Sequence, residues 1–341
     1  HLSSGRCEFH ASFVKEERGI ELLPSPLLPQ LSSTNISASE DYFFKKSRQE
    51  ILKTNAFNDD LGPKMEVNEI IKGGVSVLVN QAACPFKSFA IHRLNSSTLE
   101  DVTPGFDHRK RGILVHQVLA FIWEKLKRQI NLKELKRSEF LQLVQTAIEA
   151  TWLDLYSITP TELACRSVEN TRLLDLLDKW LEFEKDDEEF TVLSVEEKFC
   201  AEINGLNINC RIDRADRLPD GRSRIIDYKT GQCSLSDLYP PRIDSPQLLL
   251  YALKSPITQV SAVTFAQVDL LEPKLLRKDL MELNSEFPKW KEDLESMAEE
   301  IREGVAVVKP KRGDATCVYC DQKLFCRIKG SDGLRRGDDD G

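Results

Sequence analysis

The sequence lacks the features that would place it in a membrane or on a secretion route. No apolar run approaches the roughly 20 residues that a membrane-spanning helix requires, and no signal-peptide pattern opens the chain. An excess of positive charge is also missing, because 47 Lys and Arg residues stand against 55 Asp and Glu residues and give a formal net charge of −8. This balance argues against a protein that coats nucleic acid with its whole surface. No internal repeat is present.

What is present is a chain of 341 residues with the composition of a soluble globular protein, long enough for one large domain or two ordinary ones. Residues 1–65 have little periodicity and many Ser, Asn, Asp and Pro residues, so we expect a partly disordered linker or the edge of a preceding domain. The chain begins with His1 rather than Met, which indicates a piece of a longer protein. The acidic end predicts a disordered tail at 331–341, which leaves 66–330 as the folded domain.

Apolar periodicity predicts helices in the first half of this domain and strands after them. The fold class that we expect is α/β, with a central mixed β-sheet flanked by helices, a helical N-terminal part and a C-terminal Cys cluster. A fourth strand is expected at 260–268, after the three strands described below. The helices are expected at 74–94, 110–130, 138–157, 168–185, 245–254 and 278–303.

The most informative segment is Arg-Ile-Ile-Asp-Tyr-Lys-Thr-Gly at 224–231, in which an apolar run ends in Asp227 and Lys229. Two residues that lie two positions apart on a strand point to the same face. A second acidic segment, at 211–216, lies just upstream across a Pro-Asp-Gly turn. A strand end of this kind is more often solvated than catalytic, so its meaning depends on how the strands align.

Two turns set that alignment. Pro219 and Gly221 predict a three-residue hairpin loop, and counting back from it places Asp213 directly opposite Asp227. An Asn-Gly pair farther upstream predicts a two-residue hairpin, and counting back from that places Glu196 opposite Asp213. The turns therefore predict three carboxylates in a row across three adjacent strands.

The apolar alternation supports the same register, because a slip of one residue would exchange the two faces of the sheet. Glu197 falls on the apolar face, which makes it a poorer candidate than Glu196. The residues predicted on the apolar face are Val195, Phe199, Ala201, Ile203, Leu206, Ile208, Cys210, Ile212 and Ile226.

Three adjacent carboxylates repel one another, and the pKa of one of a close pair is strongly raised. A bound cation removes this conflict, and hard oxygen ligands favour Mg²⁺ or Mn²⁺. Lys229 is placed to orient a water or to neutralise charge that develops on a phosphate. The alternative is that the carboxylates form ordinary ion pairs with Arg211 and Arg214 at a solvated surface.

Three basic clusters interrupt the acidic background, at 108–111, 125–137 and 309–312. Each is by itself typical of a solvated surface. Beside a nuclease-like centre, we expect them to contact DNA.

Nine cysteines are many for a chain without a secretion signal. Three of them, Cys317, Cys320 and Cys326, form a dense cluster and need a fourth ligand to hold a tetrahedral metal or a cubane cluster. Cys84, in a Cys-Pro-Phe segment, is the candidate. Four cysteines suit Zn²⁺ or a [4Fe–4S] cluster, and their spacing does not decide between the two. Disulfides are a third, disfavoured option.

Seven short motifs follow one another along the chain. They are Cys-Pro-Phe-x-x-Phe, Arg-Gly-x-Leu-x-His, Glu-x-x-Phe, Arg-Ile-Asp-Arg-x-Asp, Ile-Asp-Tyr-Lys-Thr-Gly, Gln-Leu-x-x-Tyr-Ala and Cys-x-x-Cys-x5-Cys. In this order they resemble the RecB-type branch of the PD-(D/E)XK nucleases, and the chain is most similar to the iron–sulfur nuclease domain of AddB-like helicase–nuclease subunits. The resemblance covers roughly 74–330 and implies a restriction-endonuclease-like core. One departure is Cys210, where the family usually has Gly.

The resemblance also implies roles for individual residues. Asp213, Asp227, His116 and the backbone carbonyl of Tyr228 match the metal ligands. Glu196 matches the upstream acid, Lys229 the catalytic lysine, and Gln247 and Tyr251 a motif beside the active site and the DNA. Cys84, Cys317, Cys320 and Cys326 match the ligands of a structural [4Fe–4S] cluster.

The function that this resemblance implies is metal-dependent hydrolysis of DNA in repair or recombination, within a cytoplasmic, bacterial-type helicase–nuclease. The partners would be DNA and a helicase domain or subunit, with no membrane. Mg²⁺ or Mn²⁺ would activate a water that Lys229 and Glu196 help to position. Two alternatives are a catalytically silent DNA-binding or scaffold module of a recombination complex, and a zinc-stapled interaction domain without a nucleic-acid role.

Overall fold

The computed structural model of this chain describes residues 16–17, 20–21, 60–66, 69–97, 105–154, 160–269, 271–280, 287–318 and 320–326. The chain divides into two compact units, His1–Phe57 and Asn58–Gly341. In the first unit the described residues form two strands, β1 (Glu16–Glu17) and β2 (Ile20–Glu21), which pair antiparallel. The tail expected at 331–341 lies outside the described residues, as does most of the segment 1–65.

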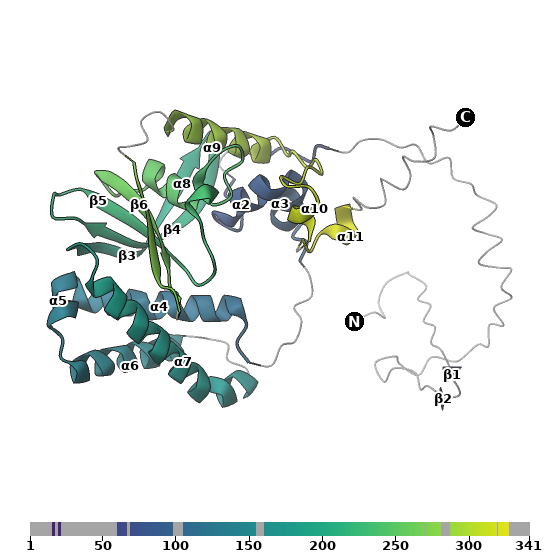
Figure 1. Ribbon diagram of the computed structural model, residues 1–341. Helices are drawn as coiled ribbons and strands as arrows, with labels where there is room; N and C mark the ends of the chain where they lie inside the picture. The colour runs from purple at the N-terminus through teal and green to yellow at the C-terminus, as the bar shows by residue number, and fades with distance from the viewer. Residues whose placement is uncertain are drawn as a thin grey trace, which may run out of the picture. The chain divides into compact units, whose positions relative to one another are not determined.

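The second unit is built on a five-stranded sheet in the order β3-β4-β5-β6-β7 (Figure 1). Only β5 and β6 pair in parallel, so the sheet is mixed, as predicted. A parallel pair needs a crossover connection, which the 3₁₀ turn η1 (Leu235–Leu238) and helix α8 (Gln247–Lys254) supply. The strands are β3 (Thr191–Ile203), β4 (Leu206–Arg217), β5 (Ser223–Lys229), β6 (Val260–Gln267) and β7 (Lys274–Asp279).

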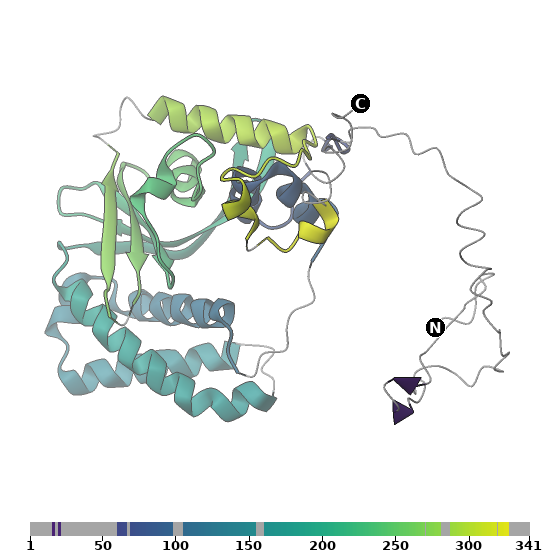
Figure 2. The same cartoon turned by 45° about the vertical axis from the view of Figure 1, so that its right-hand side comes forward.

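Helices cover both faces of the sheet, as Figures 1 and 2 show. One face carries α4 (His108–Leu126), α5 (Gln129–Glu134), α6 (Arg137–Asp154) and α7 (Pro160–Lys185). The other carries α8 together with α2 (Ser76–Ala83) and α9 (Phe287–Arg302), and α3 (Pro85–His92) packs against α2 and α9. The short helices α10 (Asp314–Cys317) and α11 (Lys323–Cys326) lie beside α2 and α3. None of the described helices combines the length and apolar character that a bilayer crossing requires.

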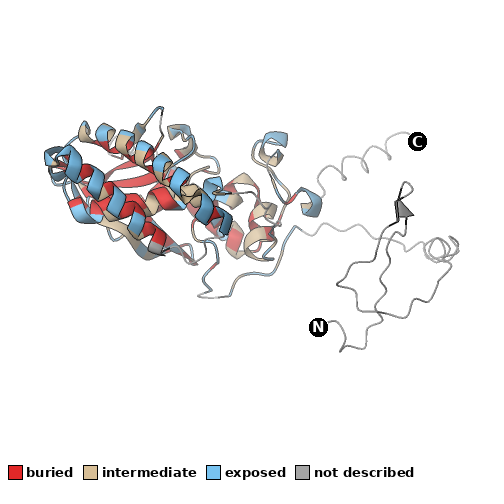
Figure 3. Ribbon diagram, turned by 90° about the horizontal axis from the view of Figure 1, so that it is seen from below, coloured by how far each residue is buried: buried red, intermediate tan, exposed pale blue. Residues whose placement is uncertain are grey.

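The two helical layers enclose two separate hydrophobic cores. Ile225 belongs to the core under α2, α8 and α9, and Ile226 belongs to the core over α4 to α7. Successive residues of a strand point to opposite faces, so β5 contributes to both cores. Figure 3 shows the sheet and the inner helix faces buried and the outer helix faces exposed. The fold class predicted from the sequence is confirmed.

Several predicted elements differ in their limits. The helix expected at 74–94 is two helices, because Pro85 starts a new one after the extended residue Cys84. The helix expected at 278–303 begins only at Phe287. Residues 278 and 279, which were expected to start it, belong to β7. This strand has four charged residues among six, so its sequence did not indicate a strand, and its pairing with β6 along the edge of the sheet determines its conformation.

The strand register follows the two turns as predicted. β3 and β4 pair Ile203 with Leu206 and keep this register on both sides of Glu196 and Asp213. β4 and β5 pair residue 217 with residue 223 and residue 214 with residue 226, which is the register that sets Asp213 opposite Asp227. The three predicted carboxylates therefore lie on three adjacent strands at matching positions.

The prediction of the faces was wrong for two residues. Val195 and Ile226 pack into the core on the α4 side, whereas Ile212 and the rest of the predicted set face the α9 side. In β4, Ile212 and Ala215 pack into the same core. Residues three apart on a regular strand point to opposite faces, so the alternation of β4 is interrupted between them. In β3 the same change occurs around Glu196, whose backbone is left-handed at φ 51°. In both strands, the side chains therefore change from one face of the sheet to the other near Glu196 and Asp213.

Candidate active site

The end of β5 and the middle of β4 line a cavity of about 470 Å³. The cavity brings together His116 from α4, Asp213 from β4, residues Asp227 and Lys229 from β5, and the start of α8. Most of the residues predicted for the site therefore share one space, although they come from four elements. The full lining is Val75, Ser76, His116, Asn209, Arg211, Asp213, Asp227, Tyr228, Lys229, Thr230, Gly231, Gln247 and Tyr251.

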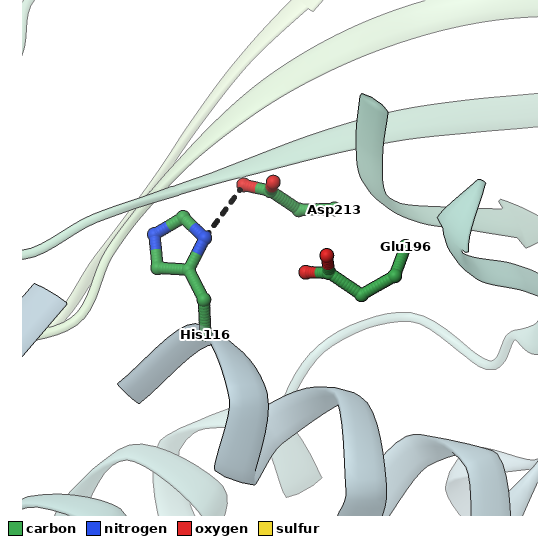
Figure 4. A group of neighbouring side chains, drawn as sticks. All are labelled: His116, Glu196 and Asp213. Carbon is green, nitrogen blue, oxygen red and sulfur yellow. Dashed lines mark ion pairs between the residues drawn. The ribbon is translucent and has the colours of Figure 1, made fainter. Parts of the chain in front are cut away.

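Three potential metal ligands, two of which line this cavity, lie close together (Figure 4). Ligand atoms of His116, Glu196 and Asp213 all lie within 4.8 Å of one another, the only such group of His, Cys, Asp and Glu in the part of the chain that the structure describes. His116 Nδ1 lies 3.3 Å from Asp213 Oδ2. Glu196 Oε2 also lies 2.9 Å from the half-exposed Arg211, so one of the surface ion pairs considered from the sequence is present.

Asp227 is the most deeply enclosed carboxylate of the site, with 1% of its surface exposed. Its Oδ2 lies 2.6 Å from Lys229 Nζ, as expected for residues two apart on a strand. Its Oδ1 is buried and has no hydrogen-bond partner among the described residues. Burial raises the pKa of Asp227 to about 6, and the nearby charge of Asp213 adds to this effect while Lys229 opposes it. A buried, unpaired carboxylate oxygen is unfavourable unless a cation or donor meets it.

The same crowding affects the other titratable groups. Burial lowers the pKa of His116, but the hydrogen bond and charge of Asp213, with the charges of Asp227 and Glu196, raise it overall. Burial raises the pKa of Glu196, and Arg211 opposes this only in part. Three carboxylates, Glu196, Asp213 and Asp227, are thus crowded beside one another. Carboxylate oxygens and an imidazole suit a divalent cation, so the donor set fits the metal that the sequence predicted.

Tyr228 connects this site to a buried charge network that the sequence analysis missed. Its backbone N–H donates to Asp213 Oδ2 at 2.8 Å, and its hydroxyl accepts a hydrogen bond from Arg214 at 2.7 Å. Arg214 is fully buried and lies 2.8 Å from Glu184 and 3.0 Å from Asp216. Arg214 therefore does not pair with the site carboxylates, as the surface alternative required, but supports Tyr228 from behind.

Aromatic rings and a second arginine complete this network. The guanidinium of Arg214 lies over the rings of Trp123 and Phe190, 4.6 and 4.7 Å from their centroids. Arg224, on the neighbouring strand β5, also binds Asp216, with 3.0 Å between its Nη2 and Asp216 Oδ2. The sequence does contain a signal for this network: charged residues stand at 214 and 216 on a strand whose neighbours are apolar. Charged side chains that are buried in a sheet have to pair with opposite charges.

Gln247 and Tyr251 both line the cavity from α8. The hydroxyl of Tyr251 donates to the backbone carbonyl of Arg211 at 2.7 Å, and its ring meets Phe199 edge-on with centroids 5.6 Å apart. Tyr251 thus fixes β4 two residues before Asp213. Cys210, where the family usually has Gly, is buried in the same core, and burial raises the pKa of its thiol to about 12.

The four predicted cluster cysteines are gathered at the other end of the domain. Cys84 is buried between α2 and α3, and Cys317 ends α10. Burial raises the pKa of the Cys317 thiol, and the nearby charges of Cys320, Cys326 and Cys84 raise it further. The eight cysteines that the structure describes are free thiols. Thiolates suit zinc or an iron–sulfur cluster, but no three of these four sulfur atoms lie within 4.8 Å of one another in the structure.

The three basic clusters have different surroundings. Lys311 and Arg312 bind Asp244 at 2.8 and 2.6 Å, so the cluster at 309–312 is engaged within the domain. The cluster at 125–137 forms ion pairs on the outer helices. The cluster at 108–111 lies at the start of α4, eight residues or fewer before His116.

Comparisons with known proteins place this architecture. No curated protein matches the sequence. One similar solved structure, described as "Crystal structure of SSO0001", is 14% identical over 75% of this chain and 97% of that one, with a TM-score of 0.28, a likeness too weak to support an argument. A family model described as "PD-(D/E)XK nuclease superfamily" matches residues 75–327, which are most of the second unit and include every residue predicted for the site. The chain belongs to the PD-(D/E)XK nuclease superfamily.

Proposed function

We propose that this chain is a Mg²⁺-dependent deoxyribonuclease that acts in DNA repair or recombination, as the nuclease domain of a cytoplasmic helicase–nuclease-like protein. The observation that carries the proposal is the buried Asp227 carboxylate, whose unpartnered Oδ1 lies in one cavity with Asp213, His116 and Lys229. A buried carboxylate oxygen without a partner is unfavourable, and a bound cation would satisfy it. Membership of a superfamily of metal-dependent nucleases supports the same reading.

Asp213, Asp227 and His116 would hold the metal, with the backbone carbonyl of Tyr228 as a further ligand. When bound there, Mg²⁺ or Mn²⁺ would lower the pKa of a coordinated water and polarise the phosphodiester. Lys229 acts as a cation, because Asp227 raises its pKa although burial alone would lower it. Its ammonium group therefore donates to a phosphate oxygen rather than accepting a proton.

The remaining residues of the site position these groups. Glu196 is placed beside His116 and Asp213 and orients the attacking water from the β3 side. Tyr251 holds β4 through the Arg211 carbonyl, and Gln247 starts the same helix at the cavity wall. Each acts on the geometry of Asp213 or on the DNA that enters the cavity.

The test is cleavage of labelled single- and double-stranded DNA with Mg²⁺ and with excess EDTA. Asp227→Asn and Lys229→Met should each lose at least about 100-fold in kcat/KM, because each removes a group that stabilises charge in the transition state. Asp178→Asn and Lys291→Met are matched controls, since each residue forms an exposed ion pair on a helix away from the cavity. Full cleavage by Asp227→Asn and Lys229→Met would refute the proposal. DNA binding without cleavage by the unmodified protein would favour the scaffold alternative.

We further propose that Cys84, Cys317, Cys320 and Cys326 hold a structural [4Fe–4S] cluster. The support is their proximity and the contacts that bind the C-terminal segment to the Cys84 region, where Lys311 N–H donates to the Ala83 carbonyl at 2.9 Å. Protein purified without oxygen should show thiolate-to-iron absorbance and about four irons per chain. Cys320→Ala should lose both, while Cys200→Ala, at an exposed strand position, should keep them. A colourless protein that carries one zinc would overturn the assignment.

A further inference from the structure

A second cavity, of about 200 Å³, adjoins the candidate active site. The two cavities share Thr230, the residue that follows Lys229. The start of α4 lies against this residue, because a methyl group added at Gly112 would be 3.5 Å from the Thr230 hydroxyl. A DNA strand that leaves the candidate active site over Thr230 would therefore enter this second cavity.

Two arginines from different helices line this second cavity. Arg111 of α4 binds Glu169 Oε2 through Nε at 3.2 Å, and Arg172 of α7 binds Glu169 Oε1 through Nε and Nη2 at 2.8 and 2.5 Å. The Glu169 side chain is 3% exposed, whereas the two arginines are 40% and 32% exposed. One buried carboxylate thus fixes both guanidinium groups at the cavity wall.

The fixed guanidinium groups keep donors for another anion. A guanidinium has five N–H donors in a rigid fork. The guanidinium of Arg111 uses one nitrogen and that of Arg172 uses two on Glu169, and neither guanidinium forms a further hydrogen bond within the described ranges. A preorganised pair of this kind matches the geometry of phosphate oxygens.

The other titratable side chains that line the cavity are those of His108 and Asp269. Asp269 Oδ1 accepts from the backbone N–H groups of Leu271 and Glu272 at 2.8 and 2.9 Å, so its own turn engages this carboxylate. Both carboxylates at this cavity are therefore engaged, Glu169 by the two arginines and Asp269 by backbone N–H groups. The open donors at the wall are cationic.

We propose that this cavity is a phosphate subsite that holds a phosphodiester of the DNA strand beside the one being cleaved. The proposal rests on the nuclease function proposed above and adds the direction in which the strand runs. Arg111 precedes His116 by five residues, roughly 8 Å along the helix axis at 1.5 Å per residue. That separation is close to the distance between one phosphate of a strand and the next.

The first test measures DNA affinity in Ca²⁺ by fluorescence anisotropy with a labelled oligothymidylate, over a range of salt concentrations. Arg111→Gln and Arg172→Gln should each weaken binding about 5- to 20-fold and reduce the salt dependence by about one counterion. Arg222→Gln is the control, because Arg222 is exposed in the turn between β4 and β5, outside the three basic clusters, and binds Asp220. If Arg172→Gln does not fold, Arg172→Lys replaces it in the test. Lysine keeps the ion pair with Glu169 but lacks the forked donors, so the DNA affinity of this variant should lie between those of the unmodified protein and Arg111→Gln.

The second test uses the strand itself. In cleavage assays, a neutral methylphosphonate replaces one phosphodiester at a time on either side of the scissile bond. At one flanking position the replacement should raise KM about 10-fold for the unmodified protein and have little effect on the Arg111→Gln/Arg172→Gln double variant.

The outcomes separate the two proposals. Unchanged binding by the arginine variants, or equal sensitivity of protein and double variant to every methylphosphonate, overturns the subsite while leaving the nuclease intact. Absence of cleavage by the unmodified protein refutes the nuclease, and the binding test then still decides the subsite.

Discussion

Replacing Asp227 by Asn in the metal-free protein is expected to stabilise the fold at pH 8, although the residue is proposed to be essential for catalysis. Burial raises the folded-state pKa of Asp227 to about 6, compared with 3.8 for an ordinary Asp. At 1.36 kcal/mol for each pH unit, this difference corresponds to about 3 kcal/mol by which the ionised carboxylate disfavours folding. Asn removes this charge, and the opposing attraction of Lys229 is already included in the raised pKa. The net expected gain is about 3 kcal/mol.

The pH dependence gives the prediction its sign. Because the folded-state pKa is raised, the protonated carboxyl contributes stability that is complete below about pH 3.8, and this contribution is lost as the pH rises through about 6. The advantage of Asp227→Asn should therefore be absent near pH 4 and complete above about pH 7. Mg²⁺ should reverse the order, because it stabilises the protein that binds it and leaves the variant unchanged.

The assay is urea denaturation at pH 4, 6 and 8, with EDTA or Mg²⁺, followed by the fluorescence of the tryptophans. Asp178→Asn is the control, because Asp178 is an exposed partner of Arg137 that lowers its pKa, and its loss should destabilise the protein slightly at pH 8. An Asp227→Asn variant that is less stable than the unmodified protein at pH 8 in EDTA, or a difference that does not change with pH, would refute the reasoning.

Three further changes test the surroundings of the site. Tyr228→Phe should lower the free energy of unfolding by about 1–2 kcal/mol, because its hydroxyl accepts from a buried guanidinium, and urea denaturation measures this. Arg214→Met should cost about 3–5 kcal/mol, because it leaves Glu184 buried without its cation; a loss below about 1 kcal/mol would contradict the network. Glu196→Gly should be more stable than Glu197→Gly by about 1–2 kcal/mol and yet less active.

The register of the site could be predicted from the sequence because local turn chemistry determines it. A three-residue loop containing Pro219 and Gly221, and an Asn-Gly hairpin, each fix one pair of strands. From these pairs the alignment of Glu196, Asp213 and Asp227 follows by counting. His116 was not reachable in this way, since it comes from a helix in another layer, and only the resemblance to a family indicated it.

Other features depend on contacts between distant segments and left weaker signals. β7 is strongly charged, and its edge pairing with β6 determines its conformation. The burial of Arg214 requires Glu184 from α7 and the rings of Trp123 and Phe190, none of which lies near it in the sequence. The second cavity likewise needs α4 and α7 to meet at Glu169. Pairing of this kind follows from how helices pack on the sheet rather than from periodicity.

Glu196 shows why the alternation of faces failed at the site itself. A non-glycine residue at φ 51° is disfavoured by about 1–2 kcal/mol, and this conformation lies where β3 moves from one core to the other. Strain of this kind persists only where the surroundings enforce it, and it often accompanies function. Glycine relieves the strain at Glu196 but only loosens the regular strand at Glu197, so the two substitutions should differ in stability. If Glu196→Gly is the more stable and the less active of the two, the backbone is held in a strained form to place its carboxylate beside His116 and Asp213; if Glu197→Gly loses the activity instead, the choice between the two acids was wrong.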